Sequence, residues 1–98
     1  MTREEIVAKL KELAPAIRAE GVTKLAIFGS RSRGDARPDS DLDVLVEVDP
    51  EAKFSLLNVS GIALLIEGAT GIETQISMKR SLEPRMAERI ADDIIEVF

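Results

Sequence analysis

The segment LAIFGSRSRGDARPDSDLDVLVEV, residues 25–48, decides the fold of this 98-residue chain. It contains two apolar runs, LAIF and VLVEV, which we predict to be buried strands because each is short and almost uninterrupted. The first run ends abruptly at Gly29, and the second follows two aspartates, Asp41 and Asp43. The polar residues between the runs are therefore expected to carry the chemistry, held in place by a strand on either side.

Asp41 and Asp43 are predicted to lie on one face of the second strand. Residues two apart along a strand share a face, so Leu42 and Val44 should point into the core instead. Two like charges on one face repel unless a cation lies between them, and carboxylate oxygens are ligands that suit Mg²⁺. We therefore predict a metal site at Asp41 and Asp43. The alternative is that they form the polar end of a strand that follows a loop.

A phosphate-binding turn is predicted just after the first strand. Backbone N–H groups at a helix start can hold phosphate, and arginine pairs readily with phosphate oxygens. The candidate nucleotide-binding residues are Gly29, Ser30, Arg31, Arg33 and Gly34. Ser30 could instead cap a short helix, and the arginines could be solvated surface charges. Metal and phosphate sites together indicate nucleotide chemistry.

The composition of the chain restricts its metal and its partners. Without cysteine or histidine, a metal must bind to carboxylates, which favours Mg²⁺ and admits Mn²⁺. The formal net charge of −5 and the lack of Tyr and Trp argue against broad nucleic-acid binding. No apolar run approaches a membrane span, so we expect a cytoplasmic protein with no membrane contact. The length predicts a single domain, residues 1–98.

The pattern along the chain predicts an α+β fold, in which helices pack on a small mixed β-sheet. Apolar residues recur at helical spacing near both ends of the chain, and Pro15 should kink the first helix near Leu13. The predicted helices span residues 2–20, 54–67 and 81–92, and the predicted strands span residues 22–28, 44–48, 72–77 and 94–98.

The predicted helix over residues 54–67, FSLLNVSGIALLIE, is unusual because it has one charge in fourteen residues. A helix that is apolar nearly all round must be buried on more than one side. One face can meet the sheet. The other is either a tightly covered part of the core or an interface with a second copy of this chain or with a partner protein.

Gly29-Ser30, followed by ten residues and then Asp41-x-Asp43, resembles the G-S-x10-D-x-D signature of the DNA polymerase beta-like nucleotidyltransferase superfamily. Within it, the sequence GSRSRGDARPDSDLD and the short length of the chain resemble the minimal nucleotidyltransferase (MNT) family. The resemblance implies a polymerase beta palm-like fold and Mg²⁺-dependent transfer of AMP from ATP, a nucleoside triphosphate. The implied acceptor is a tyrosine hydroxyl of a HEPN-type toxin protein, to which the MNT protein is the antitoxin.

The superfamily usually carries a third carboxylate on the strand predicted over residues 72–77. Counting back from Pro84 places Gln75 at this position, whereas counting from the preceding glycine-rich turn places Glu73 there. Both side chains share one face of the strand. Glu73 could act as a general base and complete a catalytic set with Asp41 and Asp43, but Gln75 could not.

A second function is therefore open at this point. A catalytically degenerate, binding-only antitoxin would neutralise its partner by protein–protein contact through the apolar helix over residues 54–67. Gln75 at the third position would favour this alternative.

Overall fold

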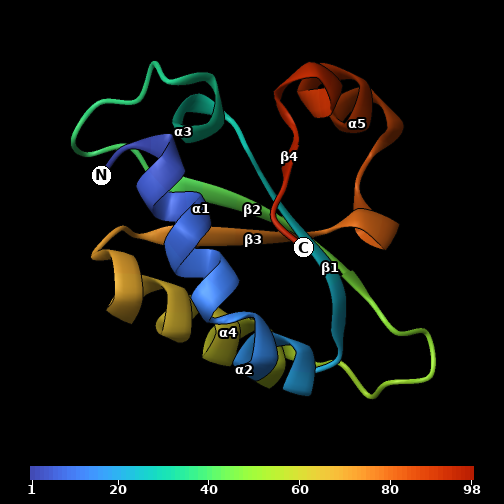
Figure 1. Cartoon of the computed structure of the whole chain (residues 1–98). Coiled ribbons are helices and arrows are strands. Elements are labelled where there is room, and N and C mark those ends of the chain that lie inside the picture. Colours follow the sequence, from blue (N-terminus) through green and yellow to red (C-terminus); the bar gives the residue numbers. More distant parts are fainter.

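The computed structural model describes the whole chain, Met1–Phe98, as one four-stranded sheet with helices packed on it (Figure 1). The helices are α1 (Arg3–Glu12), α2 (Ala14–Ala19), α3 (Ser30–Arg33), α4 (Leu56–Thr70) and α5 (Pro84–Ile90), with two short 3-10 turns, η1 (Lys79–Ser81) and η2 (Ala91–Asp93). The strands are β1 (Val22–Phe28), β2 (Leu42–Val48), β3 (Thr74–Met78) and β4 (Ile95–Glu96).

The sheet has the strand order β3-β2-β1-β4 and is mixed. β1 pairs antiparallel with β2 and with β4, whereas β2 and β3 run parallel. A parallel pair needs a crossover connection, and α4 supplies it between β2 and β3. The predicted α+β class with a small mixed sheet is thus confirmed.

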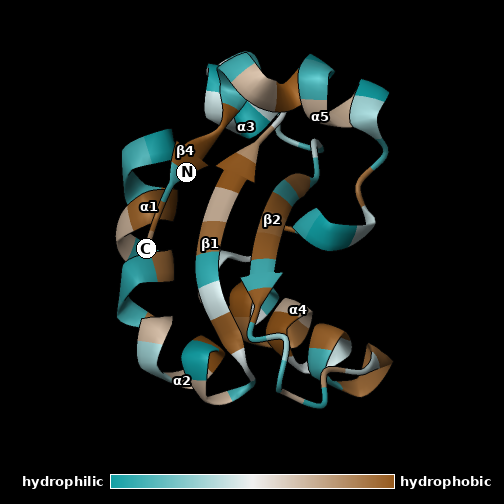
Figure 2. Cartoon of the chain, turned by 90° about the vertical axis from the view of Figure 1, so that its right-hand side faces the viewer, coloured by the Kyte–Doolittle hydropathy of each residue, from teal (hydrophilic) through white to brown (hydrophobic).

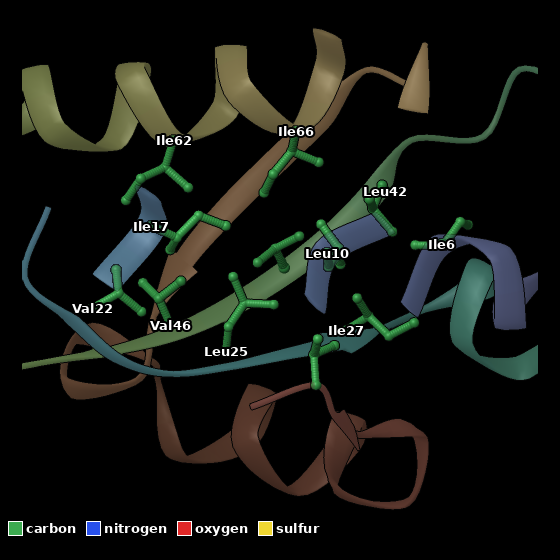
Figure 3. Close-up of a cluster of buried hydrophobic side chains, with 12 residues drawn as sticks. Ile6, Leu10, Ile17, Val22, Leu25, Ile27, Leu42, Val46, Ile62 and Ile66 are labelled. Atoms are coloured by element: carbon green, nitrogen blue, oxygen red, sulfur yellow. The ribbon is translucent and has the colours of Figure 1, made fainter. Parts of the chain in front are cut away.

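Two apolar clusters fix the helices on the sheet. The larger one joins α1, α2 and α4 to one face of the sheet, and its members are nearly or fully buried (Figure 3): Ile6, Leu10, Ile17, Val22, Leu25, Ile27, Leu42, Val44, Val46, Ile62, Ile66 and Val97. The smaller cluster places Ile90 of α5 against the opposite face, on Ala26, Phe28 and Leu45. Figures 1 and 2 both show α3 and α5 together at one end of the sheet, with α2 at the other.

The N-terminal segment is two helices because of its caps and its proline. Thr2 and Glu5 form a reciprocal capping box that starts α1. The helix ends at Leu13, and Pro15 occupies the first turn of α2, where its missing N–H costs nothing. The break lies where Pro15 predicts it.

α4 is buried on one face and open on the other. Ile62 and Ile66 are fully buried, whereas Leu56, Leu57 and Leu64 are 82%, 85% and 69% exposed. The core therefore accounts for only one side of this helix, and its leucines form an uncovered apolar surface. At 15 residues, α4 is the longest helix, and the structure contains no helix long and apolar enough to cross a membrane.

Two predicted strands are shifted or shortened. β3 begins at Thr74 rather than at residue 72 because the N–H of Ile72 donates to the hydroxyl of Thr70 and stays in the turn. β4 has only two regular residues because the pairing becomes irregular after Glu96: the N–H groups of Val97 and Phe98 both donate to the carbonyl of Leu25, whose own N–H donates to the carbonyl of Phe98. The last helix begins at Pro84, after the separate turn η1.

Candidate functional site

The ends of three neighbouring strands place the predicted site residues in a row. Phe28 at the end of β1 stands opposite Asp43 of β2, and Asp43 stands opposite Gln75 of β3. Gly29 follows Phe28 directly. The polar turn, a carboxylate and an amide therefore lie side by side across the sheet, on the face that is opposite to buried Leu42 and Val44.

Gly29 and Asp43 are in direct contact. Gly29 has φ 78° and ψ −159°, a backbone conformation that is essentially restricted to glycine. A Cβ added there would lie 2.4 Å from Oδ2 of Asp43, far inside ordinary van der Waals contact. The glycine is needed both for its backbone angles and for the space that the carboxylate occupies. The structure thus brings the turn and the acid together, as the sequence predicts.

Ser30 begins α3 immediately after this contact, and Gly34 ends it. Gly34 adopts the left-handed conformation with φ 85°, and its N–H donates to the carbonyl of Ser30. A single helical turn therefore separates the two glycines. Ser30 makes no side-chain cap to α3, because the N-terminal cap position belongs to Gly29. Its hydroxyl is the polar group of the turn that follows the Asp43 contact.

Asp41 and Asp43 make a pair of carboxylates that suits a cation. The pKa of Asp43 is raised, first by burial of its carboxyl and second by the negative charge of Asp41, while Arg33 opposes the shift. A divalent ion would relieve both causes, because it neutralises the pair and replaces lost hydration with direct ligation. Two carboxylates are an all-oxygen donor set, which fits Mg²⁺ or Mn²⁺.

Gln75 rather than Glu73 is the β3 residue next to the carboxylate pair. Its amide Nε2 donates to Oδ2 of Asp41 at 3.0 Å, and the residue stands opposite Asp43. The exposed Glu73 lies just before β3, where its backbone carbonyl accepts from the N–H of Leu42. No group of three or more acidic or histidine side chains is close enough to hold one metal ion. The role of Glu73 as a base stays a prediction.

Arg31 is buried and is directed at the loop before β2. It is only 9% exposed, and its Nε and Nη2 both donate to the carbonyl of Ser40, at 3.2 and 2.8 Å. Nη2 also donates to the carbonyl of Pro38 at 3.3 Å. The sequence predicts Arg31 as a phosphate ligand, but these contacts use its guanidinium to fasten the loop that leads into Asp41. A phosphate role for it remains untested.

Arg33 is exposed and pairs with two aspartates. Its Nε lies 3.0 Å from Asp35 and its Nη1 lies 2.8 Å from Asp93. The hydrogen bonds that Arg33 donates to these carboxylates, the one to Asp35 first, raise the pKa of Arg33. The positive charge of Arg33 also acts to lower the pKa of Asp43, so this guanidinium contributes to the electrostatics of the carboxylate pair.

Three further residues hold α3 in place, and sequence reasoning missed them. Arg3 of α1 donates from Nη1 to the carbonyl of Ser32 at 2.8 Å. The buried Ser32 hydroxyl donates in turn to the carbonyl of Asp93, whose carboxylate also holds Arg33. These contacts join residues 29 and about 60 positions apart, so no local sequence signal could have indicated them.

Comparison with known proteins identifies relatives over nearly the whole chain. Residues 3–97 match the nucleotidyltransferase domain family. The chain is 34% identical over 98 residues to the protein adenylyltransferase MntA of Thermococcus cleftensis, covering 99% of this chain and 97% of the relative. It is 31% identical over 88 residues to a protein of Methanocaldococcus jannaschii that is provisionally named a protein adenylyltransferase, covering 90% and 92% of the two chains.

Solved structures share the fold. A chain described provisionally as a minimal nucleotidyltransferase superposes with a TM-score of 0.81 at 33% identity, covering 97% of this chain and 95% of that one. An MNT antitoxin in complex with the tri-AMPylated HEPN toxin of Shewanella oneidensis superposes with a TM-score of 0.69 at 14% identity, covering 99% and 72%. With the Gly29–Asp43 contact and the Asp41–Asp43 pair in place, the match over residues 3–97 shows that this chain belongs to the nucleotidyltransferase-domain family, and within it to the minimal nucleotidyltransferases.

Proposed function

We propose that this protein is a Mg²⁺-dependent nucleotidyltransferase that moves AMP from ATP to a hydroxyl group of a HEPN-type toxin and thereby acts as its antitoxin. The observation that carries the proposal is the contact between the Gly29 turn and Asp43, because the turn that we predict to bind phosphate lies against one carboxylate of the pair. The name of the Thermococcus cleftensis relative, a protein adenylyltransferase, supports the reaction class.

Asp41 and Asp43 would hold the metal, and Gln75 would orient Asp41 through its amide hydrogen bond. When bound, Mg²⁺ supplies charge neutralisation for the triphosphate. The Ser30 hydroxyl would donate to a phosphate oxygen beside Gly29. Arg31, from its buried position, would keep the loop before Asp41 in one conformation. These residues bind and orient the nucleotide, which is the main contribution of a protein to transfers at phosphorus.

In the transfer step, the acceptor oxygen forms a bond to the α-phosphorus of ATP as the bond from that phosphorus to the bridging oxygen of pyrophosphate breaks. The acceptor proton passes to a base, and pyrophosphate carries away the leaving electron pair. Glu73 is the candidate base, since Gln75 cannot accept the proton. Replacement of Glu73 by Gln should slow transfer while the response of the protein to Mg²⁺ and ATP persists.

The partner assignment is supported by what is known of the structural neighbours. One is a toxin–antitoxin complex with AMP-PNP, and another holds a tri-AMPylated HEPN toxin. The chain itself contains no tyrosine, so a tyrosine acceptor must belong to another protein.

The test is transfer of label from α-³²P-ATP to a purified HEPN partner. We expect labelling of the partner with the wild type and Mg²⁺, and none with Asp41→Asn/Asp43→Asn. Asp39→Asn is the matched control, because it makes the same change in an exposed loop residue two positions before Asp41. Full transfer by the double variant would refute the metal assignment, and no transfer by the wild type would refute the activity.

A second candidate, the binding-only antitoxin, is favoured by two observations. Gln75 stands where a third carboxylate would complete the site, and α4 presents Leu57 and Leu64 to solvent. In that case, Asp41→Asn/Asp43→Asn would still neutralise the toxin in a growth assay, whereas Leu57→Asp/Leu64→Asp would not. The enzymatic proposal requires the reverse result for the aspartate variant.

A further inference from the structure

We infer that the free edge of β3 binds an extended segment of the acceptor protein as an added strand and that this segment presents its hydroxyl to Asp41 and Asp43. The inference rests on the proposed function, since it needs a protein acceptor. It names the surface that receives that acceptor and the chemistry of the segment that fits. Addition of a strand to an open sheet edge is a common mode of peptide recognition.

β3 has an outer edge with no neighbouring strand. It is the terminal strand of the sheet and pairs only with β2. The N–H of Leu42 donates to the carbonyl of Glu73, so the backbone groups of Glu73 face β2. Alternate residues of a strand direct their backbone groups to the same side, so those of Gln75 and Ser77 also face β2. The backbone groups of Thr74, Ile76 and Met78 therefore point outward. The carboxylate of Glu67 accepts from the N–H of Thr74 at 2.9 Å and covers only the beginning of the row.

This edge is unusual because little protects it. Proteins commonly shield sheet edges with very short strands, charges or bulges, because unpaired backbone groups attract other strands. The opposite edge of the sheet is protected in this way, because its edge strand, β4, has only two residues. β3 has five, and its outward Ile76 and Met78 are only partly buried. A row of donors and acceptors thus stays available beside the site.

The position of the edge relative to the carboxylates indicates which hydroxyl would fit. Gln75 stands between the edge and Asp43, so an added strand would lie two strand spacings from β2, about 9.6 Å. A side chain on the site face of that strand must cross Gln75 to approach Asp41 and Asp43. A tyrosine hydroxyl extends much farther from its backbone than a serine or threonine hydroxyl. The edge therefore favours a tyrosine acceptor in an extended segment.

Charges at the two ends of the edge give the segment a polarity. Glu73 is exposed at the beginning of β3, and Arg80 is exposed just after its end, with no carboxylate within ion-pair distance. The complementary segment carries a cationic side chain near Glu73 and an anionic group near Arg80. The edge also lies beside Gln75, which contacts Asp41 and stands opposite Asp43, so the occupant that we assign to it is a segment of the acceptor protein. An antiparallel second copy of β3 would also bring Glu73 beside Arg80, and it would show instead as a dimer of the free protein.

Hydrogen exchange on the complex of wild-type protein and HEPN partner tests the inference directly. In the free protein, the amides of Ile76 and Met78 should exchange fast because they point outward, and partner binding should slow them about tenfold or more. The Thr74 amide, already bonded to Glu67, should change little. Unchanged exchange of Ile76 and Met78 in a complex that transfers AMP would overturn the inference and leave the proposed function intact.

Two variants supply a kinetic readout. Arg80→Glu should raise the KM for the acceptor about tenfold with little change in kcat, because it reverses one end of the charge pattern. Arg85→Glu makes the same change on exposed α5 and should leave KM as in the wild type. Ile76→Pro removes an outward N–H and should abolish transfer while retaining the rise in melting temperature caused by Mg²⁺ and ATP.

These outcomes separate the two claims. If the wild type fails to label the partner, the proposed function falls. If the wild type labels it and both Arg80→Glu and a folded Ile76→Pro protein do so equally well, the acceptor docks elsewhere. The exposed leucines of α4 would then be the next surface to test.

Discussion

Replacement of Gly29 by Ala should be the most damaging single change in the site for the stability of the fold. The backbone angles of Gly29, φ 78° and ψ −159°, are essentially reserved for glycine, and another residue held there costs roughly 1–3 kcal/mol. The new Cβ would also meet Oδ2 of Asp43 at 2.4 Å, whereas ordinary contacts begin near 3.4 Å. Moving that partly buried carboxylate adds an overpacking cost of about 1–3 kcal/mol.

Gly34→Ala is the matched control for this variant. Gly34 also has a positive φ, 85°, but nothing lies within 4 Å of its missing Cβ. Only the left-handed backbone is disfavoured there, at about 1–2 kcal/mol. Gly29→Ala should therefore lose about 1–3 kcal/mol more than the control. With roughly 4–8 °C per kcal/mol for a domain of this size, its melting temperature should lie about 5–20 °C lower than that of Gly34→Ala.

Urea and thermal unfolding in EDTA, followed by circular dichroism, measure both variants. The double variant Gly29→Ala/Asp43→Ala divides the loss, because removal of the carboxylate relieves the contact but leaves the backbone strain. We expect the double variant to recover about 1–3 kcal/mol relative to the sum of the single changes. Equal losses for Gly29→Ala and Gly34→Ala, together with no recovery in the double variant, would show that the turn does not lie against Asp43.

Three further predictions concern the residues around this contact. In EDTA, Asp43→Asn should raise the melting temperature at pH 7, because the folded-state pKa of Asp43 is raised by burial and then by Asp41. The stability that the protonated carboxyl contributes is complete below its unfolded pKa and is lost as the pH rises through the folded pKa. The difference in melting temperature between the variant and the wild type should therefore vanish toward about pH 3. A constant difference from about pH 3 to 7 would contradict this prediction. Arg31→Lys should lower the free energy of unfolding in urea by about 1–3 kcal/mol, because one ammonium cannot reproduce the hydrogen bonds to the carbonyls of Pro38 and Ser40. The same change at the exposed Arg37 should leave it unchanged. Equal effects of the two variants would show that the bonds from Arg31 do not stabilise the loop. Gln75→Glu should lower the melting temperature in EDTA by repulsion and enlarge the rise caused by Mg²⁺; a response to Mg²⁺ no larger than that of the wild type would contradict the position of Gln75.

Much of the site was readable from local pattern. The two-residue repeat of a strand puts Asp41 and Asp43 on one face and Leu42 on the other, and the structure has this arrangement. The abrupt end of the first apolar run places Gly29 at a turn, and Pro15 marks the break between α1 and α2. These features depend on neighbours within a few positions along the chain, so the residues themselves carry them.

Other features depend on pairings that no short stretch of sequence contains. Spacing left Glu73 and Gln75 as alternatives, and only the register of β3 on β2 places Gln75 against the carboxylate pair. The position of Arg31 after the glycine turn predicted a phosphate ligand, and only the fold shows that its guanidinium donates to carbonyls of the following loop. The anchoring of α3 through Asp93 joins residues about 60 positions apart.

The sequence by itself thus determined which side chains share a face and that the chain turns at Gly29 and breaks before Pro15, because backbone periodicity and the conformational limits of glycine and proline act locally. The tertiary structure alone decided which strand edge stays open, which residue stands beside the acidic pair and which arginine is already occupied. Sheet register and helix docking are fixed by burial of the apolar core, and that core is built from side chains of all the elements together.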